Sequence, residues 1–164
     1  MSEASRTPEQ ANAHQESRLT SQRATITELE TPVIQVWAGI LALPLIGTVD
    51  TRRAQDMNER LLQTIVDTGS EIVLLDITGV PVVDTAVARH LLETVAAARL
   101  LGAEVFIVGL TSRTAMTLVQ LGVELGDVTT RSTMSKGLEL AFGRLGLEVT
   151  KRPAIQAARP EANA

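Results

Sequence analysis

The sequence predicts one α/β domain over about residues 31–147, with a mostly parallel central sheet, an N-terminal β-hairpin and about four helices. Three observations support this prediction. Short apolar runs of strand length alternate with longer stretches that place apolar residues every three or four positions. Glycines fall at the ends of these segments, where turns and helix caps need them. Two β-rich runs meet at Ala38-Gly39 before the first helical stretch.

The first predicted elements are the hairpin at 33–46 and the helix that follows it. Pro44 lacks an amide hydrogen, so we expect it near a sheet edge or a strand end. Asp50 or Thr51 is suited to cap the helix, and Gly69 is suited to end it after about residue 68.

The stretch from 71 to 89, EIVLLDITGVPVVDTAVAR, is the centre of the predicted domain. Ile72–Ile77 is an apolar run with one aspartate, which is typical of a strand covered on both faces. Gly79 and Pro81 break this pattern, so we expect a tight loop over 78–83. Asp84 is a good N-cap for the next helix, and Thr85 follows at its first position.

The remaining elements continue the alternation of strand and helix. A buried strand is expected at Glu104–Val108, and a last short strand at 127–130. One short helix begins near Ser112 and ends at Gly122, and a final helix runs from a Thr133 cap through Phe142. The order predicts a sheet with right-handed helical crossovers.

Polar segments flank the predicted domain. Residues 1–30 are interpreted as a polar leader or linker, although Leu19, Ile26 and Leu29 have a helical spacing that would suit packing on a partner chain. Residues 148–164 are expected to form a disordered tail. The start of the chain lacks the basic and apolar regions of a signal peptide, which favours a cytoplasmic protein.

Composition excludes several classes of function. The formal charge is −4 and only three residues are aromatic, so neither a basic surface nor stacking platforms for nucleic acid are expected. The absence of cysteine excludes disulfides and thiolate metal sites. The most apolar stretch, 33–47, is too short to cross a membrane. We therefore expect no nucleic-acid partner, no membrane partner and no metal or other cofactor.

Residues suited to catalysis are scarce, so the sequence predicts a protein that is not an enzyme. His14 lies in the leader, and the lone His90 is expected at the surface or boundary of its helix. Neither a serine-hydrolase G-x-S-x-G motif nor a phosphate-binding G-x-x-x-x-G-K-[ST] loop occurs. Asp76 and Asp84 could pair as carboxylates, but we expect Asp84 to cap the helix and Asp76 to hold loop amides.

Hydroxyl groups gather near the predicted carboxyl ends of the strands. Each has a structural role open to it as a cap or turn residue, except Thr85, whose neighbour Asp84 already fills the cap position. These hydroxyls belong to Thr78, Thr85, Ser112, Thr114 and Thr117.

The stretch LDITGVPVVDTAVARHLLETVAAARLLGAEVFIVG, followed by TLVQLGVELGDVTTRSTMSKGLELAF, resembles a STAS domain of the RsbR-type scaffolds of the bacterial stressosome. The resemblance spans about Thr31 to Leu145. It implies a non-enzymatic phosphoprotein that controls a stress sigma factor or a similar output through partner switching. It further implies three partners: a serine/threonine switch kinase, a cognate phosphatase and a second STAS protein. Both homo-oligomers and hetero-assemblies are expected.

The same resemblance assigns site residues. The phosphorylated hydroxyl of the family maps onto Thr85, and a second one maps onto Thr117, with Thr114 and Ser112 as competitors. The partner-binding loop comprises Asp76, Thr78, Gly79, Val80, Pro81 and Asp84.

Two alternatives to the scaffold remain open, a stand-alone anti-anti-sigma factor and a STAS module that senses a nucleotide or lipid. RsbR-type scaffolds carry an N-terminal globin-like sensor, whereas about 30 residues precede the predicted domain in this sequence.

Overall fold

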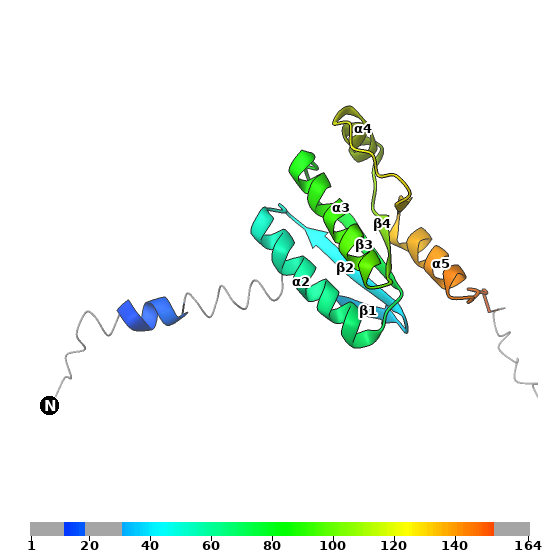
Figure 1. Cartoon of the computed structure of the whole chain (residues 1–164), viewed down its shortest axis with the longest axis horizontal. Coiled ribbons are helices and arrows are strands. Elements are labelled where there is room, and N and C mark those ends of the chain that lie inside the picture. Colours follow the sequence, from blue (N-terminus) through cyan, green and yellow to red (C-terminus); the bar gives the residue numbers. More distant parts are fainter. Residues whose placement is uncertain (1–11, 19–30, 153–164) are drawn as a thin grey trace, which may run out of the picture.

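The computed structural model describes residues 12–18 and 31–152. Within these residues the chain forms one five-stranded sheet and five helices, the first of which is a short exposed helix over 12–18. The domain itself has the four helices that were predicted (Figure 1). Its elements are β1 (Ile34–Trp37), β2 (Ile40–Ile46), α2 (Thr51–Thr68), β3 (Ile72–Gly79), α3 (Thr85–Leu100), β4 (Glu104–Val108), α4 (Ser112–Gln120), β5 (Thr129–Arg131) and α5 (Met134–Arg144).

The strands lie in the sheet in their order along the chain, β1-β2-β3-β4-β5. β1 runs antiparallel to β2, which confirms the hairpin, and Gly39 in its turn has a φ of +85°. The other neighbouring strands are parallel, which confirms the mostly parallel sheet. β3 is therefore the central strand, and the loop after it leaves from the middle of the sheet.

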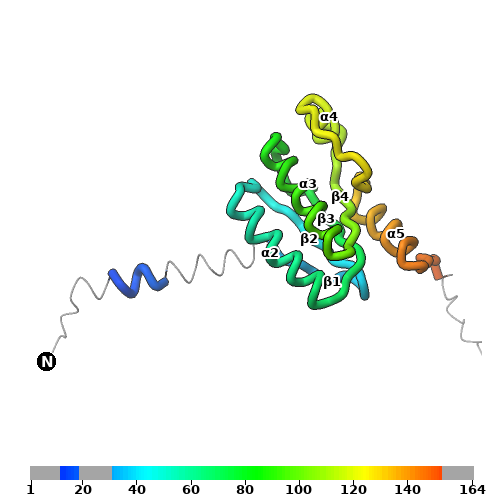
Figure 2. Tube along the Cα trace, in the orientation of Figure 1, coloured from blue at the N-terminus to red at the C-terminus, as the bar shows by residue number. Residues whose placement is uncertain are grey.

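Helices cover the two faces of the sheet unequally. α2 and α3 pack on one face, where their apolar side chains meet Leu43, Leu75 and Ile107. α5 packs on the opposite face against Leu74 and Phe106. Both drawings show the sheet between these layers and α4 beyond the end of β4 (Figure 1 and Figure 2). The core is aliphatic apart from Phe106, as the scarcity of aromatic residues implied.

Each helix of the domain begins with a polar side chain that accepts a hydrogen bond from a backbone amide of the first turn. Such a cap satisfies an amide that has no partner within the helix. Asp84 fills this role as predicted, whereas α4 is capped by Thr111 rather than by a residue from 112 onward. The caps are Asp50 for α2, Asp84 for α3, Thr111 for α4 and Thr133 for α5.

β3 extends two residues beyond the predicted strand, so Thr78 and Gly79 belong to the sheet and not to the loop. Gly79 pairs with Ile46 of β2, and the Gly79 carbonyl accepts the Gly47 amide at 2.9 Å. A Cβ on Gly79 would lie 2.7 Å from the Leu45 carbonyl oxygen, so the two backbones can approach only because this residue is glycine.

Smaller differences occur at other element ends. Pro44 lies near the end of β2, past the last residue paired with β1, which agrees with its missing amide. β5 starts at Thr129 instead of residue 127, and α5 continues to Arg144 instead of ending at Phe142.

The predicted leader and tail fall largely outside the described residues. Leu19, Ile26 and Leu29 lie there, as do residues 153–164. The boundaries of the leader, the domain and the tail therefore stay predictions.

Candidate functional site

The connection from β3 to α3 is anchored in the core at two valines. Val80 and Val83 are buried, whereas Pro81 and Val82 between them are exposed. Val82 is 69% exposed, which is unusual for a valine, and the sequence interpretation did not single it out. Pro81 and Val82 therefore form a short apolar tip on the exposed surface of this connection. Val80, a member of the predicted partner-binding loop, has its side chain in the core, and the assignment of that loop to partner binding stays a prediction.

The two aspartates of this region have separate local roles. One oxygen of Asp76, Oδ1, accepts hydrogen bonds from the Thr78 amide at 2.9 Å and from the Thr78 hydroxyl at 2.6 Å. Asp84 accepts the Val87 amide at 2.8 Å and so caps α3. These contacts confirm that Asp84 caps the helix and that Asp76 holds a backbone amide, as expected. They give no support to a carboxylate pair for acid–base catalysis. We call the two bonds between Asp76 and Thr78 the Asp76–Thr78 clamp.

Gly109, the first residue after β4, lies directly against the Asp76–Thr78 clamp. Its φ is +84°, and a Cβ there would meet the Thr78 hydroxyl oxygen first and would lie 2.6 Å from the Thr78 amide nitrogen and 2.8 Å from Asp76 Oδ1. Such distances are far inside van der Waals contact, so only glycine fits. The sequence marked Gly109 as a turn residue, but nothing in it showed this close approach.

The hydroxyl of Thr85 lies at the first position of α3 and is exposed. It makes no hydrogen bond to any residue in the described part of the chain, which agrees with the absence of a structural duty inferred from the sequence. Ser112 occupies the equivalent position of α4 and is likewise exposed, and no described residue bonds its hydroxyl either.

The other candidate hydroxyls are engaged within their own segments. Thr114 is hydrogen-bonded to the Thr111 hydroxyl at 2.9 Å, and the Thr117 hydroxyl donates to the Arg113 carbonyl at 3.0 Å. Thr117 and Thr114 are half-buried. Their assignment as modification sites stays a prediction.

His90 is buried, at 6% exposed, so its predicted place at the surface or boundary of α3 is wrong. Its ring lies between helices, with Nε2 3.5 Å from the Thr51 hydroxyl of α2 and Nδ1 3.4 Å from Glu93. One turn further on, the fully buried Thr94 donates to Asn58 of α2 at 2.6 Å. The α2–α3 contact is thus partly polar. His90 is buried because α2 packs over it, which the sequence of α3 alone does not indicate.

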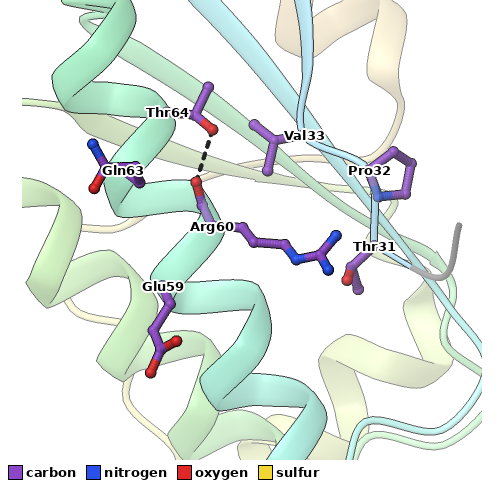
Figure 3. Close-up of a pocket in the computed structure, with 7 residues that line it drawn as sticks. All are labelled: Thr31, Pro32, Val33, Glu59, Arg60, Gln63 and Thr64. Carbon is purple, nitrogen blue, oxygen red and sulfur yellow. Dashed lines mark hydrogen bonds between the residues drawn. The ribbon is translucent and has the colours of Figure 1, made fainter. Parts of the chain in front are cut away.

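A shallow hollow of about 630 Å³ lies between the start of the domain and α2 (Figure 3). Its side chains do not converge on one point, because Arg60 reaches toward Thr31 while Glu59 points away from it (Figure 3). The Thr64 hydroxyl is already bound to the Arg60 carbonyl at 2.7 Å. This hollow offers no set of groups that would hold a nucleotide, and it lies on a different element from Thr85.

No helix in the described ranges 12–18 and 31–152 is long and apolar enough to cross a membrane. The same residues contain no group of three or more histidine, aspartate or glutamate side chains that could hold a metal ion.

Comparison with known proteins relates this geometry to a family. A profile of the STAS domain matches residues 31–136. The chain is 41% identical over 140 residues to the RsbT co-antagonist protein RsbRA of Bacillus subtilis, an alignment that covers 85% of this chain and 49% of RsbRA. It is 36% identical over 121 residues to RsbRD of the same organism, covering 74% of this chain and 44% of RsbRD. The chain thus spans about half the length of these curated relatives.

Solved structures of STAS proteins also superpose on this domain. A variant of Moorella thermoacetica RsbS superposes with a TM-score of 0.62 at 26% identity, covering 71% of this chain and 98% of that one. The unphosphorylated anti-sigma factor antagonist SpoIIAA superposes with a TM-score of 0.56 over 69% of this chain and 96% of SpoIIAA, where 10% identity shows the fold alone. The chain therefore belongs to the STAS domain family and resembles its RsbR-type members.

Proposed function

We propose that this chain is a non-enzymatic STAS scaffold of a cytoplasmic partner-switching pathway, controlled by phosphorylation of Thr85. The observation that supports the proposal most directly is the exposed, unbonded Thr85 hydroxyl beside the exposed tip Pro81-Val82. The similarity to RsbT co-antagonist proteins and to RsbS supports the type of pathway. A serine/threonine switch kinase would add the phosphate, and a cognate phosphatase would remove it.

A phosphate on Thr85 would change the surface more than the fold. It adds about −1.5 to −2 charges at neutral pH. The start of a helix favours negative charge, but Asp84 already accepts the Val87 amide and repels a second anion. The net effect on stability is therefore small. A partner that covers Val82 must desolvate the new charge, which is costly unless the partner supplies a cation.

The proposed partners are a second STAS protein, in a hetero-assembly, and further copies of this chain. The second phosphorylated residue in this proposal is Thr117, which lies on α4. Because its hydroxyl donates to the Arg113 carbonyl, modification there requires that bond to break.

Thr85→Ala is expected to abolish most labelling by the proposed switch kinase, because it removes the free hydroxyl. Ser135→Ala is the matched control, since Ser135 is an exposed hydroxyl in the first turn of α5 to which no described residue is hydrogen-bonded, and it is not a candidate site. Radiolabelled phosphate incorporation measures both variants. Labelling of Thr85→Ala at the wild-type level would refute the assignment. Both variants should unfold within about 0.5 kcal/mol of wild type, since neither exposed hydroxyl makes a hydrogen bond to a described residue.

Thr85→Asp is expected to weaken binding of the partner that a pull-down with mass spectrometry identifies by about tenfold or more. The carboxylate places a charge at the edge of the Pro81-Val82 tip that the bound partner must desolvate. Titration calorimetry of wild type and Thr85→Asp measures the change, with Thr85→Asn as the uncharged control. Equal affinities for Asp and wild type would contradict a charge-controlled surface.

Self-association is a separate expected result. Sedimentation at micromolar concentration is expected to show assemblies larger than one chain, alone or with the second STAS protein. A strict monomer under both conditions would contradict the scaffold proposal and favour a stand-alone antagonist.

A further inference from the structure

The starts of α3 and α4 are joined by a direct contact between the segments that precede them. β3 and β4 are adjacent parallel strands, and Asp76 is paired in register with Val108. Both strands end at the same edge of the sheet, so the Asp76–Thr78 clamp on β3 lies beside Gly109 at the end of β4. α3 carries Thr85, and α4 begins three residues after Gly109.

The contact between Gly109 and the Asp76–Thr78 clamp leaves no room for a side chain at position 109. A Cβ on Gly109 would meet the Thr78 hydroxyl first, and it would lie 2.6 Å from the backbone nitrogen of Thr78 and 2.8 Å from Asp76 Oδ1, so the neighbours at this point are both donors of the clamp and their acceptor. Closely packed groups transmit strain to one another. We therefore expect a displacement of the main chain at Gly109 toward the clamp to displace Thr78 or strain its bonds to Asp76.

The link on the α3 side is short and stiff. The Val80 amide donates to the Ile77 carbonyl at 3.0 Å, and Val80 and Val83 are buried in the core. Asp84 follows and caps α3. On the α4 side, only Leu110 separates Gly109 from the cap residue Thr111.

We propose that Asp76 is a positioning residue that couples the start of α4 to the start of α3 through the Asp76–Thr78 clamp. This inference rests on the proposed function only for the biological role of the coupling. In that role, a phosphate or a bound partner on α4 changes the conformation of the segment that presents Thr85. The coupling itself is a property of the free protein. Without Asp76, the amide and the hydroxyl of Thr78 both lose their acceptor. Gly109 then packs against a Thr78 side chain that is no longer held in place.

Two amides are matched reporters of the two helix starts. The Ala88 amide donates to the Asp84 carbonyl of α3 at 2.9 Å, and the Ala115 amide donates to the Thr111 carbonyl of α4 at 2.9 Å. The Gly137 amide, bonded to Thr133 at the start of α5, is the control, because α5 lies on the opposite face of the sheet. Amide hydrogen exchange followed by NMR on the full chain measures how often each bond opens.

The perturbation is Thr111→Ala, which removes the cap of α4. Loss of an N-cap is expected to speed exchange at Ala115 by about fivefold. If the starts of the helices are coupled, exchange at Ala88 rises by about twofold or more while Gly137 is unchanged. In an Asp76→Ala background the response of Ala88 to Thr111→Ala is expected to vanish, which makes a double-mutant cycle for the coupling.

Two conservative variants keep the test decisive if Asp76→Ala does not fold. Asp76→Asn retains an oxygen acceptor of the same shape and is expected to preserve the response of Ala88 to Thr111→Ala. Thr78→Val keeps the amide bond but removes the hydroxyl donor, and is expected to reduce the response. Thr130→Val on β5 is the control for loss of a strand hydroxyl.

A response of Ala88 that is absent in the wild-type background, or that persists unchanged in Asp76→Ala and Thr78→Val, would overturn the coupling. Such a result leaves the labelling of Thr85 untouched, because labelling is measured by phosphate incorporation. Conversely, coupled exchange in a protein whose Thr85 is never labelled would support the inference and refute the proposed function. The two failures are thus distinguishable.

Discussion

The Gly109→Ala variant is expected to be about 2–5 kcal/mol less stable than wild type, as the sum of two costs. The left-handed φ of +84° is unfavourable for alanine, and the new methyl group would overlap the Thr78 hydroxyl, the Thr78 amide and Asp76 Oδ1. These atoms cannot yield cheaply, since the amide is main chain and the hydroxyl and Oδ1 are hydrogen-bonded to each other. Urea unfolding followed by the fluorescence of Trp37, the one tryptophan of the sequence, measures the loss.

Gly102→Ala separates the two costs. Gly102 has nearly the same φ, +82°, but nothing lies within 4 Å of the position that its Cβ would occupy. Its alanine variant is expected to lose only the conformational cost, about 1–2 kcal/mol. If the Gly109 and Gly102 variants lose equal stability, Gly109 does not bear on the Asp76–Thr78 clamp.

Gly137→Ala is expected to be about 1–3 kcal/mol less stable than Gly143→Ala, although both substitutions lie in α5. Helix propensity alone would stabilise each variant by up to about 1 kcal/mol. At Gly137, however, a Cβ would lie 2.5 Å from Val108 Cγ1 and 3.4 Å from Leu74 Cδ2 in the core. The methyl group must push α5 away from the sheet. Nothing lies within 4 Å of the equivalent position at Gly143.

A double-mutant cycle identifies the clashing group. Val108→Ala removes Cγ1 and is expected to destabilise wild type through the cavity it leaves. In the Gly137→Ala background the same change is expected to cost less, because it also removes the overlap. Additive effects of the two substitutions would show that α5 adjusts without meeting Val108. Trp37 is a suitable probe here, because it packs edge-on against Phe142 of α5 with ring centroids 5.4 Å apart.

The order of the elements could be predicted from the sequence because the signals for it are local. Apolar periodicity marked β3 and α3, and Asp84 and Gly69 marked helix ends through bonds within a few residues. The resemblance to RsbR-type STAS domains agrees with the comparisons. The assignment of Thr85 and Thr117 as phosphorylated residues stays a prediction.

What the sequence could not predict depends on contacts between distant segments. Gly79 looked like a loop residue, yet pairing with β2 keeps it in the sheet. His90 looked like a surface residue, yet Thr51 of α2 lies against it. Gly109 and Gly137 are required by neighbours that lie about 30 residues away in the chain. The exposure of Val82 could not be predicted, because the sequence does not show which of Val80, Val82 and Val83 is turned toward the core.

The sequential strand order of the sheet bears on how the chain folds during synthesis. Each strand pairs with the strand made just before it, so the sheet can grow from the hairpin onward as residues leave the ribosome. α5 is the exception, because it is the last element and covers the face that holds Leu74 and Phe106. Until residues 134–144 emerge, no other helix among residues 12–18 and 31–152 covers that face, and we expect the nascent domain to present it to chaperones or to neighbouring chains. We therefore expect the nascent domain to become less prone to aggregation once α5 has formed.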